Sequence, residues 1–289
     1  MYATTDTSDS TYNVYGKDSE SAPFCCSVAQ SLVTSLVITE GGGNNYVLEE
    51  YYSSSSGNLS LCGGTSFAVG FFVTVYGGGG NDTIGGSPAT ACPYLWETFY
   101  GGSGNDVIVG AGRTTNIYGE GSATGGDWLI DSGDASDSDT ISCTLDGGDG
   151  VDTLESVNDL GTTMYGGPGD DEMWGGDGPD KMYGGPGDDG MSGGHGDDEM
   201  HGDADDDIMG GHADADKLYG GSGDDVLCGA AGDYNEMWGG DDDDILDGTG
   251  ITDKTGGGSG TDTCDSATTY DAAPSCDSLS ALSYQCGSY

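Results

Sequence analysis

Large apolar residues recur at every ninth position through the middle of the chain. Between Gly166 and Cys228 they occupy the eighth place of seven consecutive nonapeptides, which begin at Gly166, Gly175, Gly184, Gly193, Gly202, Gly211 and Gly220. The shared pattern is Gly-Gly-x-Gly-x-Asp-x-U-x, where U is the large apolar residue. The last three residues predict a short strand with U pointing inward, because side chains alternate across a strand. The glycines predict a tight turn before each strand, since they allow torsions that other residues avoid.

Two nonapeptides make one coil of 18 residues, and a fixed period of this kind is typical of a solenoid. Successive coils are expected to stack at the strand spacing, about 4.8 Å. The spacing predicts that Asp171 stacks on Asp189 and Asp207 along one side of the stack. Asp180 is expected to stack in the same way on Asp198 and Asp216.

Stacked carboxylates repel each other, and turn carbonyls point into the same gap. About six oxygens around one point suit a hard divalent cation, and flexible oxygen cages favour Ca²⁺ over Mg²⁺. With seven tandem copies, the repeat resembles the RTX (repeats-in-toxin) haemolysin-type calcium-binding nonapeptide. This resemblance implies an all-β fold, a parallel β-roll or β-solenoid with Ca²⁺ between successive turns.

The resemblance extends beyond the tandem block. Further copies begin at Gly77, Gly101, Gly147, Gly239, Gly248 and Gly257, and a ten-residue copy runs from Gly229 to Trp238. The β-roll is therefore predicted over residues 77–265, degenerate over 77–146 and regular over 147–265. On the order of ten Ca²⁺ ions are expected. The predicted metal ligands are Asp82, Asp106, Asp152, Asp171, Asp180, Asp189, Asp198, Asp207, Asp216, Asp225, Asp244, Asp253 and Asp262. Asn235 stands near the Asp position of the ten-residue copy, which predicts a weaker site there.

The two ends of the chain lack the glycine period. Residues 1–76 are rich in Ser, Thr and Tyr with strand-like runs, and we expect a β-rich N-terminal cap or assembly module. Residues 266–289 are expected to cap the other end, because open coils expose strand edges. Nine cysteines favour an oxidising compartment, and Cys264 and Cys276 are the best candidates for one disulfide. Zinc is disfavoured because no pair of CxxC motifs occurs.

Charge excludes several kinds of partner. The 289 residues carry 51 acidic and five basic side chains, a formal net charge of −46. Nucleic acid is excluded because phosphate binding needs clustered Lys and Arg. An anionic membrane surface would repel the chain. The sequence contains no run of about 18 apolar residues, so membrane insertion is not expected.

Two rows of side chains invite more than one interpretation. Seven of the eight methionines fall at U, where a flexible core filler is expected rather than a metal or redox role. The residue after U is expected to face outward, and it is aromatic at Tyr165, Trp174, Tyr183, Tyr219 and Trp238. Such a row is either a contact site for a partner or a stack that pairs one coil with the next.

No catalytic constellation accompanies the repeats. Gly190 to Gly194 fits the GxSxG pattern, but that motif needs a strand-turn-helix elbow and here straddles two repeats. Residues 1–76 contain one basic residue, Lys17, and no His, too little for acid–base catalysis. We therefore expect no enzyme, but a secreted, calcium-folded structural protein of a bacterial cell surface, matrix or filament. Its partners would be further copies of itself or cell-surface and matrix components. A calcium-dependent adhesin or ligand-binding module is the alternative.

Overall fold

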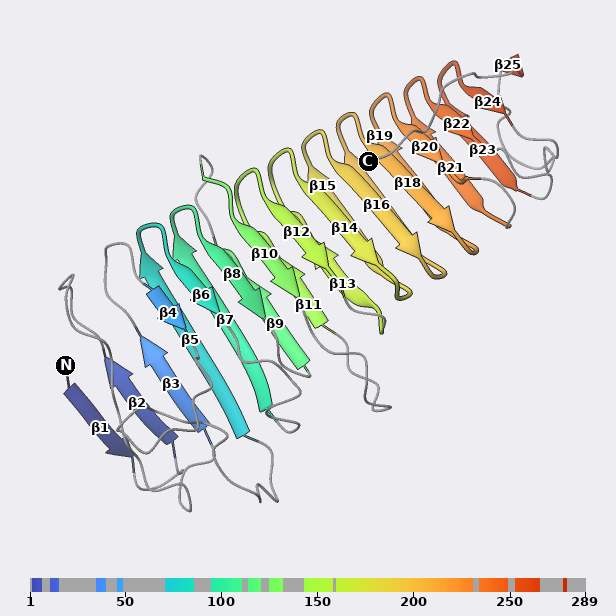
Figure 1. The fold of residues 1–289 in the computed structure, drawn as a ribbon. Helices are drawn as coiled ribbons and strands as arrows, with labels where there is room; N and C mark the ends of the chain where they lie inside the picture. The colour runs from blue at the N-terminus through green and yellow to red at the C-terminus, as the bar shows by residue number, and fades with distance from the viewer. Residues whose placement is uncertain are drawn as a thin grey trace.

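The computed structural model describes residues 2–6, 11–15, 35–39, 46–48, 71–85, 95–110, 114–120, 125–131, 143–157, 160–230, 234–248, 253–265 and 278–279. Within these ranges every regular element is a β-strand, and the strands form two long sheets that face each other along an elongated molecule (Figure 1). This confirms the expected all-β parallel roll. No helix in the described ranges is long and apolar enough to cross a membrane.

Sheet A contains β1, β2 and the odd-numbered strands from β3 to β23. In spatial order they are β1 (Tyr2–Asp6), β2 (Thr11–Tyr15), β3 (Ser35–Thr39), β5 (Phe71–Gly79), β7 (Leu95–Ser103), β9 (Thr114–Tyr118), β11 (Cys143–Asp146), β13 (Thr162–Tyr165), β15 (Lys181–Pro186), β17 (Glu199–Ala204), β19 (Lys217–Ser222), β21 (Glu236–Asp241) and β23 (Lys254–Ser259). All neighbours pair in parallel from β2 onward, and β1 pairs with β2 in antiparallel.

Sheet B contains the even-numbered strands from β4 to β24, together with β25. In spatial order they are β4 (Tyr46–Leu48), β6 (Thr83–Gly85), β8 (Val107–Gly110), β10 (Trp128–Asp131), β12 (Thr153–Ser156), β14 (Glu172–Gly176), β16 (Gly190–His195), β18 (Ile208–Ala213), β20 (Val226–Cys228), β22 (Ile245–Asp247), β24 (Thr263–Asp265) and β25 (Ser278–Leu279). From β3 to β24 the chain crosses from one sheet to the other after every strand, so each pair of strands makes one coil of the roll.

The coil geometry continues on both sides of the regular block. β5 runs through the boundary that the sequence places between residues 76 and 77, and it pairs in parallel with β3. Strands β9 and β10 belong to the degenerate part, 77–146, and keep the register of their neighbours: Ile117 pairs with Leu145, and Leu129 with Leu154. Whether residues 1–76 form a module of their own stays a prediction, as does the cap at 266–289.

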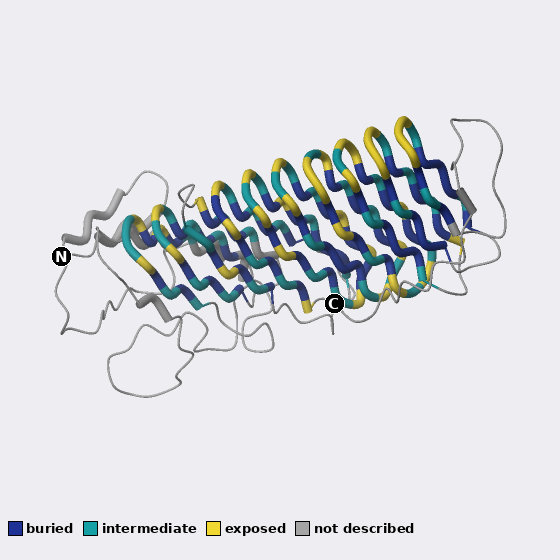
Figure 2. The backbone as a smooth tube through the Cα atoms, turned by 90° about the horizontal axis from the view of Figure 1, so that it is seen from above, coloured by how far each residue is buried: buried dark blue, intermediate teal, exposed yellow. Residues whose placement is uncertain are grey.

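Between the two sheets, the core is a double file of inward-facing residues that runs from Val75 in β5 to Cys264 in β24. Figure 2 shows this buried interior beneath the exposed turns. All seven methionines at U are at most 4% exposed, which confirms the predicted inward row. Register places Met182 between Met164 and Met200 in sheet A, and Met191 between Met173 and Met209 in sheet B. Flexible, unbranched side chains suit this narrow interior because they adapt to irregular gaps.

The outward aromatic row of sheet A is a stack. The rings of Tyr165, Tyr183, His201 and Tyr219 follow one another at centroid distances of 4.7–5.1 Å, with interplanar angles of 10–12°. A second stack joins Tyr76, Tyr100 and Tyr118. Parallel pairing brings equivalent positions to the strand spacing, which is close to the preferred distance between stacked rings. For Tyr165, Tyr183 and Tyr219 the structure therefore shows the stack that pairs one coil with the next. Trp174 is different, because it lies in sheet B with Glu155 and Ser192 as its neighbours. The ring of Trp238 lies under the Lys254 ammonium group.

Several turns replace a glycine with a charged or polar residue and still keep its backbone conformation. Asp203, Asp205, His212, Asp214 and Asp242 all have φ between 72° and 79°, in the left-handed region. Aspartate and histidine enter this region more readily than other non-glycine residues, so the turn survives at modest cost.

Candidate metal centre

The aspartates at the sixth place of the repeats form two rows, one on each edge of the roll. The first edge consists of the turns that lead from sheet A into sheet B, and the second edge of those that lead back. The first row contains ten aspartates: Asp82, Asp106, Asp127, Asp152, Asp171, Asp189, Asp207, Asp225, Asp244 and Asp262. All ten are at most 2% exposed.

A ladder of hydrogen bonds joins the first row from end to end. The backbone N–H of each aspartate donates to Oδ1 of the aspartate one coil later, at 2.7–3.1 Å along the whole row. The predicted stacking of Asp171 on Asp189 and Asp207 is thereby confirmed. Because the strand that follows each turn is in register with its neighbours, every carboxylate of the row is held in the same orientation.

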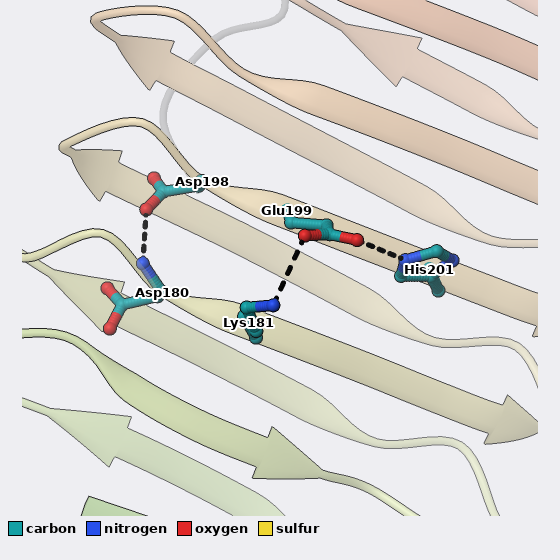
Figure 3. Close-up of polar contacts among 5 residues, drawn as sticks. All are labelled: Asp180, Lys181, Asp198, Glu199 and His201. Atoms are coloured by element: carbon teal, nitrogen blue, oxygen red, sulfur yellow. Dashed lines mark hydrogen bonds and ion pairs between the residues drawn. The ribbon is translucent and has the colours of Figure 1, made fainter. Parts of the chain in front are cut away.

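The second row is shorter. It runs Thr162, Asp180, Asp198, Asp216, Asn235, Asp253, joined by the same type of bond. The predicted stacking of Asp180 on Asp198 and Asp216 is confirmed, and Figure 3 shows the bond from Asp180 N–H to the Asp198 carboxylate. Thr162 and Asn235 occupy places that aspartate fills elsewhere. The two edges of the roll thus differ in their number of carboxylates.

The second oxygen of these carboxylates is the feature that indicates a cation. Oδ2 is buried and has no hydrogen-bond partner in twelve of the aspartates: Asp106, Asp127, Asp152, Asp171, Asp180, Asp189, Asp198, Asp207, Asp216, Asp225, Asp244 and Asp262. A buried charged oxygen without a partner costs several kcal/mol, and proteins almost always satisfy it. Twelve in periodic array therefore indicate a ligand that recurs with the coil.

Each Oδ2 lies close to the first glycine of its own repeat, which leaves no room for a side chain at that position. A methyl carbon built on Gly147 would lie 2.6 Å from Asp152 Oδ2 and 2.7 Å from the carbonyl oxygen of Gly166, one coil later. A methyl carbon on Gly184 would meet Asp189 Oδ2 and, at 2.9 Å, the carbonyl oxygen of Gly202. We call the place next to this glycine the corner of a repeat. It is defined by the Oδ2 atom of one repeat and the glycine carbonyl oxygen of the next coil.

The corner corrects the role that the sequence assigned to the first glycine. Gly147 and Gly184 do not have a positive φ, whereas Gly148, Gly150 and Gly185 do. Torsional freedom therefore explains the second and fourth glycines of the repeat. The first is glycine because a side chain there would fill the corner.

Burial changes the titration of the rows. It raises the pKa of Asp198, Asp207 and Asp216 to about 8, and neighbouring aspartates of the same row raise it as well by repulsion. The pKa of Asp171 and of Asp189 rises to about 7 for the same first cause. In the metal-free roll these carboxyls consequently hold protons near neutral pH, and a cation that enters a corner competes with those protons.

These oxygens fit Ca²⁺. Carboxylate and backbone carbonyl oxygens are the ligands of hard cations, and Ca²⁺ accepts irregular cages that Mg²⁺ does not. In the described ranges no three His, Cys, Asp or Glu side chains form one metal-binding group, so each corner combines a carboxylate with backbone oxygens. A bound Ca²⁺ would neutralise the buried charges of neighbouring coils. The chain's own contribution is to place Oδ2 and the carbonyl oxygen of the next coil at the same corner.

A second line of acids lies outside the first row. Asp170, Asp188, Asp206 and Asp224 are exposed, and each accepts a backbone N–H of the next coil on Oδ1, at 2.9–3.2 Å. Water can solvate these exposed carboxylates. They therefore lack the feature that indicates a metal ligand in the two rows, which is a buried Oδ2 without a hydrogen-bond partner.

All thirteen aspartates predicted as ligands lie in one of the two buried rows. The sequence missed Asp127, a full member of the first row that is 2% exposed. It lies 21 residues after Asp106 and 25 before Asp152, so a search at a spacing of 18 passes over it. The signal that could have found it is the order Asp127-Trp128-Leu129, which matches Asp-x-U. Cys264 is fully buried, while Cys276 lies outside the described residues, so their disulfide stays a prediction.

Comparison with known proteins agrees with this geometry. A family model described as the RTX calcium-binding nonapeptide repeat (4 copies) matches residues 71–88, 96–112, 165–200, 174–209, 191–218 and 201–236. These segments cover residues 165–236 of the regular block and parts of two coils before it. No curated protein matches the chain.

Proposed function

Because the repeats of this chain belong to the RTX calcium-binding nonapeptide family, we propose that the protein is a secreted, non-catalytic structural protein whose roll folds when it binds Ca²⁺. The observation that carries the proposal is the pair of buried carboxylate rows with orphaned Oδ2 atoms. A row of buried charges at coil spacing is unstable by repulsion until a cation neutralises it. Modules that bind Ca²⁺ outside cells work at about 0.1–1 mM, so folding would follow export.

Two features support a structural role over a catalytic one. Ser192, the serine of the GxSxG pattern, lies within the continuous strand β16 and is 8% exposed, so it forms no nucleophile elbow. His201 is stacked between Tyr183 and Tyr219 and contacts Glu199 at 3.3 Å (Figure 3). The exposed His195 and His212 lie at the C-terminal ends of strands β16 and β18.

The aromatic stacks also favour the structural role over an adhesin. A sugar or an apolar ligand would bind to the face of an aromatic ring, but the faces of Tyr183 and His201 are covered by the rings on either side. The stack presents ring edges to solvent. Next to it, Lys181 and Glu199 form an ion pair at 3.5 Å, and Lys254 and Glu236 another at 3.7 Å. Contacts between coils therefore account for much of this face.

Self-association tests the structural role. The charge of −46 opposes contact between copies, and each Ca²⁺ removes two charges, so filaments or large oligomers should form with Ca²⁺ and dissolve with a chelator. The measurement is multi-angle light scattering and electron microscopy of the full chain, with Mg²⁺ at equal concentration as the control. A monomer at high protein concentration in millimolar Ca²⁺ would favour the adhesin instead.

A further inference from the structure

The ladder of the second edge contains one amide, Asn235, with an aspartate on either side. Asn235 is fully buried and lies in the ladder between Asp216 and Asp253. The backbone N–H of Asp216 donates to Asn235 Oδ1 at 2.8 Å, and Asn235 N–H donates to Asp253 Oδ1 at 3.0 Å. As a rung of the ladder, Asn235 is equivalent to an aspartate.

The other end of the Asn235 amide is different. The Asp216 N–H requires an acceptor, which fixes Oδ1 on the ladder and turns the NH₂ group toward the corner. Nδ2 donates to the carbonyl oxygen of Gly229 at 2.5 Å. A methyl carbon built on Gly229 would lie 2.9 Å from this nitrogen, whereas the same test at Gly193 meets the Oδ2 of Asp198. A donor with partial positive charge thus occupies the place where the rows have an anionic oxygen.

The same hydrogen bond affects the preceding corner. In the second row the corner of Asp180 includes the carbonyl of Gly193, and that of Asp198 includes the carbonyl of Gly211, each one coil later. By this spacing the carbonyl of Gly229 belongs to the corner of Asp216. That carbonyl already accepts the Asn235 amide. One residue therefore removes the carboxylate of its own corner and occupies a carbonyl of the corner before it.

We propose, on the basis of the calcium-dependent function above, that Asn235 interrupts the ion row of the second edge. The coil at β21 is closed there by hydrogen bonds instead of Ca²⁺. The first edge has no such break, because its ladder contains aspartate at every rung from Asp82 to Asp262. The two edges consequently hold different numbers of ions, and the C-terminal coils depend on Ca²⁺ chiefly through the first edge.

The test is the number of Ca²⁺ ions bound per chain, measured by equilibrium dialysis and elemental analysis at saturating Ca²⁺. Asn235→Asp supplies an oxygen in place of the amide donor and releases the Gly229 carbonyl, so the count should rise by at least one. Asn105→Asp adds the same charge to an exposed turn position and should leave the count unchanged. An Asn235→Asp variant that folds with Ca²⁺ and binds the wild-type number of ions would overturn the proposal.

A converse variant keeps the test decisive if Asn235→Asp does not fold. Asp207→Asn places an amide in the middle of the first row, where Asp189 N–H would still find an acceptor. The count should fall by at least one, while circular dichroism in Ca²⁺ still shows the β-roll. An unchanged count would mean that an amide in the ladder does not exclude an ion. A wild-type chain that binds no Ca²⁺ would instead refute the proposed function itself, so the two failures are distinguishable.

Discussion

Removal of Ca²⁺ at pH 7.4 is expected to unfold the roll. In excess chelator the circular-dichroism spectrum should be that of a disordered chain, and titration with Ca²⁺ should restore a β spectrum in one cooperative transition. The reason is that the core contains only two U side chains per coil. In addition, twelve buried Oδ2 atoms among the described residues have no hydrogen-bond partner when the metal is absent. Ion binding then supplies much of the folding free energy. Mg²⁺ should act poorly, because it demands a regular octahedral site.

The Ca²⁺ midpoint of folding of single variants tests which aspartates are metal ligands. Asp189→Ala removes one Oδ2 and the acceptor of the Asp171 N–H, a loss of about 3 kcal/mol. Spread over on the order of ten ions, this should raise the Ca²⁺ midpoint of folding by about 1.5- to 2-fold. Asp177→Ala, an exposed turn aspartate outside both rows, is the matched control and should leave the midpoint in place. Equal midpoints for the two variants would show that the buried row does not hold the ions.

Acidification is expected to stabilise the folded roll in part when Ca²⁺ is absent, because protons then neutralise the buried carboxylates. The carboxyls of Asp198, Asp207 and Asp216 have a pKa of about 8 in the folded, metal-free roll, against 3.8 ordinarily. Between these values the folded state binds more protons than the unfolded chain. The stability they contribute is therefore fully present below about pH 4 and is lost progressively as the pH rises from about 4 to about 8. In chelator, the β spectrum should appear near pH 5 and disappear by pH 8.

The control for this second prediction is the same pH series in saturating Ca²⁺, in which the β spectrum should persist at pH 8. Measurement at pH 5 keeps the chain above its isoelectric point of about 4.1, which limits precipitation. A chelated chain that is more folded at pH 8 than at pH 5 would contradict the assignment of raised pKa values to these rows.

The period of nine was sufficient to predict the coil, because it fixes which residues meet. Asp171 and Asp189 differ by one coil of 18, and Met164 and Met182 by the same interval, so their neighbours follow from counting. Counting fails where residues are inserted. Additional residues between Gly119 and Gly126 change the sequence spacing of Asp127 from the neighbouring row aspartates. Asp127 nevertheless forms the same ladder hydrogen bonds as the other members of the row.

Other features depend on the register in three dimensions. The sequence did not show whether the aromatic residues after U form a contact surface or a stack. The stacked rings of Tyr183 and His201 answer this question for their part of sheet A. Asn235 was expected only to weaken a site. That its NH₂ group turns onto the Gly229 carbonyl depends on which oxygen the Asp216 N–H takes, and sequence spacing does not specify this choice.

The central claim is that the corners of the buried rows hold Ca²⁺. It is tested most directly by a crystal structure of the calcium-bound protein with anomalous diffraction data collected at a long wavelength, where Ca²⁺ scatters anomalously. We predict a peak in each corner of the first row, for example between Asp189 Oδ2 and the Gly202 carbonyl oxygen, and none beside Asn235 Nδ2. Empty corners, or peaks only at exposed carboxylates such as Asp170 and Asp188, would contradict the account.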